Sequence, residues 1–177
     1  MATLKLNLPT SLTLSRIILI PVFMFTVYLH PLFGAFIFSI ASLTDFLDGY
    51  LARRSGDITK FGIILDPIAD KFLVISALIV LVDMERLAAW IAITIIVREF
   101  LVTGLRVVAL SKDIVIPAEM GGKIKTTIQI IAILCLILGR SIFNIDLYDI
   151  GIVLIWAALF LSIISGVQYT ISFGKKI

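Results

Sequence analysis

Charged side chains are scarce in this sequence: Asp, Glu, Lys and Arg together make up 15% of the 177 residues, while 60% are hydrophobic. A soluble domain is usually about one quarter charged, because its surface needs those charges. The mean hydropathy of +1.15 therefore excludes a soluble globular domain. Since a membrane-spanning helix takes roughly 20 apolar residues, the length allows about six spans and little else. We expect a single integral-membrane domain over residues 1–177.

Several familiar functional patterns are also missing. Cysteine occurs once, at Cys135, so an intrachain disulfide is excluded. Neither Cys/His clusters with zinc spacing nor the Gly-x-x-x-x-Gly pattern of a phosphate-binding loop occurs. A basic stripe with interleaved aromatic residues is absent too, which predicts no nucleic-acid partner.

Apolar runs separated by Pro, Gly and charged residues predict an all-α fold with six transmembrane helices. A short N-terminal interfacial segment, MATLKLNLPTS, is expected before the first helix, stopped by Pro9. The expected helices are Leu12–Leu29, Pro31–Arg53, Ile58–Val82, Leu87–Leu110, Met120–Leu138 and Asp149–Phe173.

The distribution of positive charge predicts the orientation in the membrane. With the N-terminus inside, the outer loops hold only Arg86 and Arg140, and the inner segments hold the other basic side chains that flank the spans. We therefore expect both termini to be cytoplasmic. These inner residues are Lys5, Arg16, Arg53, Arg54, Lys60, Lys112, Lys123, Lys125, Lys175 and Lys176.

Four aspartates fall inside the second and third expected spans. The apolar part of the second span, from Leu32 to Thr44, is too short to cross about 30 Å of hydrocarbon, so its helix must continue through DFLDGYLARR. Asp45 then lies about 12 Å along the axis from Arg53, and Asp66 and Asp70 lie about 9 and 15 Å from Lys60. Asp48 completes a group at similar depth on two consecutive helices.

An ionised carboxylate at that depth costs several kcal/mol unless it is paired, protonated or bound to metal. Four carboxylates facing one another require more cations than Arg53 and Lys71 supply, and clustered oxygen ligands suit Mg²⁺ or Mn²⁺. Two alternatives remain: the aspartates are interfacial caps, or they form a proton or cation relay in a cation-coupled transporter. Small residues beside the acids, Gly49, Ala52 and Gly62, leave room for a bulkier ligand.

The pattern Asp45-x2-Asp48-Gly49-x2-Ala52-Arg53-x8-Gly62-x3-Asp66-x3-Asp70 resembles the signature of the CDP-alcohol phosphotransferase family at every fixed position. Three further stretches, NLPTSLTLSRIILIPVF, REFLVTGLR and GKIKTTIQ, are similar to parts of bacterial members that make phosphatidylglycerophosphate. The last span matches in hydrophobic character alone.

The resemblance implies transfer of a phosphatidyl group from CDP-diacylglycerol to sn-glycerol 3-phosphate, with release of CMP, in the bacterial plasma membrane. It implies two Mg²⁺ (or Mn²⁺) ions held by Asp45, Asp48, Asp66 and Asp70, with Asp70 also the candidate general base. The active site would face the cytoplasm, and the donor's acyl chains would enter from the membrane lipids. The residues that the resemblance assigns to CDP-diacylglycerol binding are Asp48, Gly49, Ala52, Arg53, Thr59 and Gly62.

Basic residues are the candidates for binding the phosphate of the acceptor. Arg98 lies about 18 Å along its helix from Leu110, too deep for a charge that only sets topology. Arg106, Lys123 and Lys125 complete the set, with positive-inside anchoring as the alternative explanation for the two lysines. Glu99 is adjacent to Arg98 in sequence, but we expect it to point to another part of the helix surface.

The sequence constrains the identity of the acceptor alcohol and the oligomeric state less than it constrains the reaction. The same chemistry with inositol phosphate, serine or phosphatidylglycerol is an alternative to glycerol 3-phosphate. The family resemblance also suggests a homodimer. Small residues of the last span could permit close helix contact, either between copies or within one bundle. These residues are Gly151, Ala157, Ala158, Ser162 and Gly166.

Overall fold

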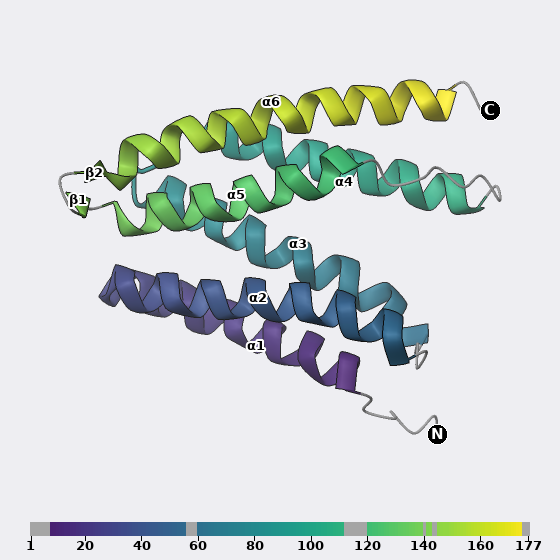
Figure 1. The fold of residues 1–177 in the computed structure, drawn as a ribbon, viewed down its shortest axis with the longest axis horizontal. Helices are drawn as coiled ribbons and strands as arrows, with labels where there is room; N and C mark the ends of the chain where they lie inside the picture. The colour runs from purple at the N-terminus through teal and green to yellow at the C-terminus, as the bar shows by residue number, and fades with distance from the viewer. Residues whose placement is uncertain (1–7, 56–59, 112–119, 140, 143–144, 175–177) are drawn as a thin grey trace. The chain divides into compact units, whose positions relative to one another are not determined.

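A computed structural model describes residues 8–55, 60–111, 120–139, 141–142 and 145–174. Within these residues the chain forms six long helices and one very short antiparallel strand pair (Figure 1). The helices are α1 (Leu8–Leu29), α2 (Pro31–Ser55), α3 (Lys60–Asp83), α4 (Ala89–Ser111), α5 (Met120–Leu138) and α6 (Leu147–Gly174). The strands are β1 (Ser141–Ile142) and β2 (Ile145–Asp146).

The predicted all-α fold is confirmed, and the predicted helices agree with the observed ones to within a few residues. The start of α1 is the main difference: the helix begins at Leu8, with Pro9 in its first turn, so residues 8–11 of the expected interfacial segment belong to the helix. Proline is tolerated there because the first N–H groups of a helix have no intrahelical acceptor. Residues 1–7 of the expected interfacial segment lie outside the described residues.

The continuation of α2 past its apolar part is also confirmed. The helix runs from Pro31 through to Ser55, 25 residues in all, although its apolar stretch ends at Thr44. Such a helix is about 37 Å long, enough to cross the hydrocarbon layer. The part with the acidic residues therefore belongs to the same continuous helix.

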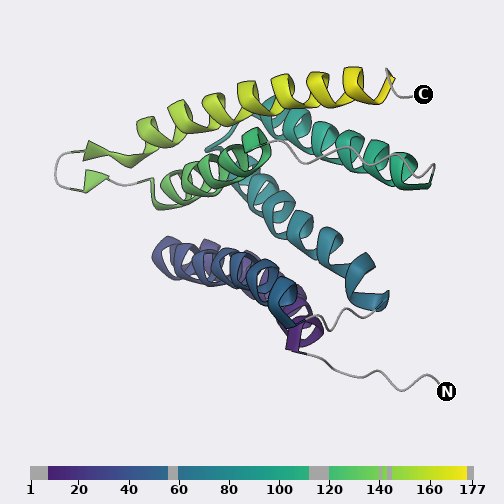
Figure 2. The same ribbon diagram turned by 45° about the vertical axis from the view of Figure 1, so that its right-hand side comes forward.

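The chain divides into two compact units, residues 1–80 and residues 81–177. In the first unit, α1 and α2 pack side by side as an antiparallel pair joined at His30 (Figures 1 and 2). Phe23 and Phe38 are fully buried between them, with ring centroids 5.5 Å apart. This pairing fixes the helix that holds Asp45 and Asp48.

In the second unit, α6 packs along α5 and also against α4 (Figures 1 and 2). Its core is formed by aliphatic side chains, among them Ile95 of α4, Ile133 and Leu136 of α5, and Ile155 of α6. Asp146 precedes α6, and its side-chain oxygen accepts a hydrogen bond from the Tyr148 N–H at 3.0 Å, as an N-cap does. The predicted break at Arg140–Asp146 thus contains β1 and β2, with Ser141 opposite Asp146.

Large apolar side chains also cover the outside of the helices. Phe25 of α1 is 70% exposed, and Phe160 of α6 is 61% exposed. Contiguous exposed apolar surface marks a membrane or a protein interface. Among the described segments, α6 is the helix long and apolar enough to span a membrane by length and composition; α1, α2 and α5 contain shorter apolar stretches. The predicted number of six spans stays a prediction.

Candidate functional site

The eight signature residues lie on two helices of the first unit. Asp45, Asp48, Gly49, Ala52 and Arg53 belong to α2. Because the helix is continuous there, positions three and four residues apart share one face of it.

The rest of the signature belongs to α3, which begins at Lys60. Gly62, Asp66 and Asp70 follow one another at intervals of four residues, so they form a stripe along α3. The side chains of residues 45–70, including all four aspartates, lie outside the described part of the structure, as does the whole of Thr59.

The chemistry of this donor set suits a hard divalent cation, since four carboxylates supply only oxygen ligands. Helical spacing places each pair of acids on one face of its own helix, which fits binding of Mg²⁺ or Mn²⁺. Among the side chains that the structure describes, no group of three or more His, Cys, Asp or Glu residues could hold a metal ion. The four aspartates of the signature are not among those side chains.

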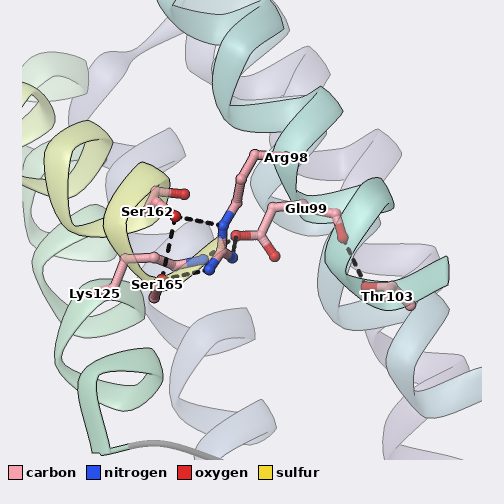
Figure 3. Close-up of polar contacts among 6 residues, drawn as sticks. All are labelled: Arg98, Glu99, Thr103, Lys125, Ser162 and Ser165. Atoms are coloured by element: carbon pink, nitrogen blue, oxygen red, sulfur yellow. Dashed lines mark hydrogen bonds and ion pairs between the residues drawn. The ribbon is translucent and has the colours of Figure 1, made fainter. Parts of the chain in front are cut away.

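The expected acceptor site is described at two of its four residues. Arg98 of α4 and Lys125 of α5 lie close together, because both contact the same carboxylate oxygen, Oε1 of Glu99 (Figure 3). The distance from Arg98 Nη1 to this oxygen is 3.0 Å. The side chains of Arg106 and Lys123 lie outside the described residues.

The expectation that Glu99 points away from Arg98 is therefore wrong. Neighbouring Cβ atoms diverge by about 100° around a helix, but long side chains can still bring their charged ends together. Here the Lys125 ammonium, coming from another helix, holds the Glu99 carboxylate on the same side as the guanidinium. The sequence does contain a signal for this pair: a glutamate next to an arginine deep in an apolar span favours an ion pair, because charges at that depth need partners.

Helix α6 supplies two further partners of Arg98 that sequence reasoning missed. Arg98 Nε donates to the carbonyl oxygen of Ser162 at 2.7 Å, and Nη2 donates to the Ser165 hydroxyl at 2.5 Å (Figure 3). Gly166 leaves space for the arginine, since a Cβ there would lie 3.2 Å from Nε. The sequence signal was weak: two serines and a glycine in an apolar helix also suit plain packing.

Buried polar groups continue beside this network. Gln129 follows Lys125 by one turn of α5 and is 3% exposed, and Ser162 is 1% exposed. Within the described residues, neither Gln129 Nε2 nor Ser162 Oγ has a hydrogen-bond partner. Buried polar atoms are costly in an apolar interior unless they are hydrogen-bonded, and bound water commonly supplies such bonds in proteins.

The small residues of α6 mostly face their own chain. A Cβ on Gly151 would lie 2.8 Å from the Leu136 side chain, and Gly166 borders Arg98. Ala158 and Ser162 are also buried within this unit. These four residues pack the bundle itself, and the homodimer stays a prediction without their support.

Comparison with known proteins agrees with the signature. The family model described as CDP-alcohol phosphatidyltransferase matches residues 6–164. A Bacillus subtilis (strain 168) protein named CDP-diacylglycerol--glycerol-3-phosphate 3-phosphatidyltransferase is 44% identical, over 92% of this chain and 93% of the relative. Proteins of the same name are 41% identical in Rickettsia bellii (92% and 93% covered) and in Shigella flexneri serotype 5b (94% of both). The chain belongs to the CDP-alcohol phosphatidyltransferase family.

Proposed function

We propose that this chain transfers the phosphatidyl group of CDP-diacylglycerol to sn-glycerol 3-phosphate, forming phosphatidylglycerophosphate and CMP. The observation that carries the proposal is the near-complete match to relatives named for this reaction, at 40–44% identity. The complete aspartate signature on α2 and α3 supplies residues for the chemistry.

The reaction exchanges one bond at phosphorus for another. The acceptor hydroxyl oxygen bonds to the phosphorus next to diacylglycerol, and the bond from that phosphorus to the CMP oxygen breaks. Asp70 is the proposed base that takes the hydroxyl proton, which requires a position in line with the phosphorus.

Asp45, Asp48, Asp66 and Asp70 are the residues that would hold two Mg²⁺ or Mn²⁺ ions. When bound, such ions polarise the phosphoryl oxygens and offset the charge of the leaving CMP. Asp70 is thus proposed in two roles, as a ligand and as the base.

The donor is assigned to the same two helices. Gly49, Ala52 and Gly62 lack bulky side chains, so a nucleotide could approach the backbone of α2 and α3 closely. Arg53 would contact the phosphates of CDP-diacylglycerol, with Asp48 and Thr59 beside them. A guanidinium suits this role because its planar array of donors matches phosphate oxygens.

The acceptor phosphate is assigned to Arg98, Arg106, Lys123 and Lys125. The pairing of Arg98 with Lys125 through Glu99 supports this assignment, since two cations held together in a buried place suit a dianionic group. An uncharged acceptor such as serine would not need them. The glycerol hydroxyls could satisfy polar groups such as the Gln129 amide.

We further propose an integral protein of the bacterial plasma membrane, with the site and both termini on the cytoplasmic side. The nucleotide and glycerol 3-phosphate would reach the site from the water phase, and the acyl chains from the bilayer. A homodimer is proposed from family resemblance.

An acceptor screen with the purified protein tests the function. CDP-diacylglycerol and Mg²⁺ are supplied with glycerol 3-phosphate, inositol phosphate, serine or phosphatidylglycerol in turn, and CMP and the lipid product are measured. We expect CMP and phosphatidylglycerophosphate with glycerol 3-phosphate, and no turnover after the metal is chelated. Turnover with another alcohol alone would refute the acceptor. Cation flux in proteoliposomes without CMP formation would favour a transporter.

A further inference from the structure

Glu99 lies between the two cations assigned to the acceptor site, and its carboxylate oxygen Oε1 is shared by both (Figure 3). Arg98 Nη1 lies 3.0 Å from this oxygen, and the Lys125 ammonium contacts it from α5. The Thr103 hydroxyl donates to the Glu99 backbone carbonyl at 2.7 Å, one turn further along α4. Because Lys125 belongs to α5 and Glu99 to α4, the contact between the ammonium and the carboxylate connects these two helices.

The contacts with Glu99 stabilise the two cations because all three side chains are largely shielded from water. The side chains of Arg98 and Lys125 are 14% and 4% exposed, and that of Glu99 is 20% exposed. Two positive charges so little exposed to water repel each other and lose solvation energy. A shared carboxylate offsets both costs and fixes the separation of the two charged groups.

The three side chains still sum to a net charge of +1, from two cations and one anion. A guanidinium and an ammonium held side by side suit an anionic ligand such as a phosphate. Three of the five N–H donors of Arg98 engage Ser162, Ser165 and Glu99 within the described part of the chain, so the guanidinium is held in one orientation.

We propose that Glu99 is a positioning residue: it holds Arg98 and Lys125 side by side, so that together they receive the phosphate of the acceptor. This inference rests on the proposed function, because it concerns the same acceptor site. Glu99 acts through the two cations and has no role at the reacting phosphorus. The serines of α6 fix the orientation of Arg98 from the opposite side.

Steady-state kinetics of Glu99→Gln, with each substrate varied in turn, tests the proposal. The amide keeps the size of the side chain but removes its charge. We expect the KM for glycerol 3-phosphate to rise about tenfold or more, with the KM for CDP-diacylglycerol within about twofold. Glu99→Asp, which keeps the charge, should recover part of the loss. Glu85→Gln, an exposed acid in the turn after α3, is the matched control and should leave both KM values unchanged.

A double-mutant cycle shows whether Glu99 acts through Lys125. In a Lys125→Gln background, Glu99→Gln should raise the KM for glycerol 3-phosphate much less than it does alone. Additive effects would overturn the proposal. So would a lower KM in Glu99→Gln, since the carboxylate would then only compete with the phosphate.

Misfolding and failure of the proposed function can both be recognised. An unchanged KM for CDP-diacylglycerol shows that Glu99→Gln is folded. If that variant does not fold, Ser165→Ala, which removes one acceptor of Arg98, should raise the KM for glycerol 3-phosphate about threefold. An unchanged KM in Ser165→Ala would then overturn the positioning of Arg98. Wild-type protein that does not use glycerol 3-phosphate would refute the proposed function itself.

Discussion

At the scale of single residues, charge inside the apolar helices is rare, and each charged group needs compensation. In the second unit the compensation is visible, because Glu99 joins Arg98 and Lys125. In the first unit, four aspartates on α2 and α3 are proposed to be compensated by divalent metal ions. The two sets correspond to the proposed phosphoryl-transfer site and the proposed acceptor site.

Replacing Asp48 by Asn tests the role of the aspartates. The amide removes a charged ligand from the proposed metal site, so we expect Mg²⁺-dependent CMP release to fall by about a hundredfold or more. The assay is turnover at saturating concentrations of both substrates. Asp149→Asn, at an exposed acid in the first turn of α6, is the control and should keep nearly full activity. Equal losses from both changes would mean that the carboxylates of the signature are not the catalytic centre.

At the scale of the helices, close packing of α1 on α2 depends on a glycine. A Cβ on Gly34 would lie 2.6 Å from the Cα of Val27, which is backbone and cannot move aside without moving α1. Gly104 in α4 differs, since a Cβ there would meet nothing within 4 Å.

These two glycines form a matched pair of substitutions. Gly34→Ala should lower the free energy of unfolding by about 1–3 kcal/mol, because the helices must separate. Gly104→Ala should leave it unchanged or raise it by about 0.5–1 kcal/mol, because alanine favours the helix. Thermal or denaturant unfolding in detergent measures both. Similar effects of the two changes would contradict the close approach of α1 and α2.

Arg86, one of the few basic residues predicted on the outer side, stabilises the end of α5. Its Nη1 donates to the carbonyl oxygens of Leu136, at 3.0 Å, and Ile137. Gly139 ends the helix with a φ of 53°, a left-handed conformation that glycine adopts at helix C-termini. The guanidinium thus satisfies carbonyl groups that the helix itself leaves without donors.

Arg86→Gln should therefore destabilise the second unit. Loss of charged hydrogen bonds to the two carbonyls should cost about 1.5–3 kcal/mol of unfolding free energy. Glu85→Gln, at the preceding residue, should cost little. Unfolding curves of both variants are the measurement, and equal midpoints would show that the contact with α5 contributes nothing to stability.

At the scale of the whole molecule, the orientation in the membrane can be measured by labelling. Single cysteines are placed at Ala88 and at Lys176 in a Cys135→Ala background, and intact cells are treated with an impermeant thiol reagent. Ala88 is exposed between α3 and α4 and avoids the structural contacts of Arg86. We expect labelling at position 88 and protection at position 176. The reverse pattern would overturn the orientation and the cytoplasmic site with it.

The helices and the signature could be predicted because both depend on local sequence. Apolar runs and their Pro, Gly and charged breaks determine where a helix begins and ends, and α5 was predicted at its observed bounds, Met120–Leu138. Likewise, helical spacing alone places Asp66 and Asp70 in one stripe of α3. The first turn of α1 was missed because Pro9 permits a helix start as readily as it ends an earlier segment.

The partners of the charged side chains were decided only by the tertiary structure. Arg98 meets Ser162, Lys125 meets Glu99, and Arg86 meets Leu136; these partners are 64, 26 and 50 residues apart in the chain. No local pattern specifies such contacts, because they depend on how α6 packs against α4 and α5 and on where long side chains place their charged ends. The sequence by itself thus determined the helices and the family of this protein, and packing decided which charges act together.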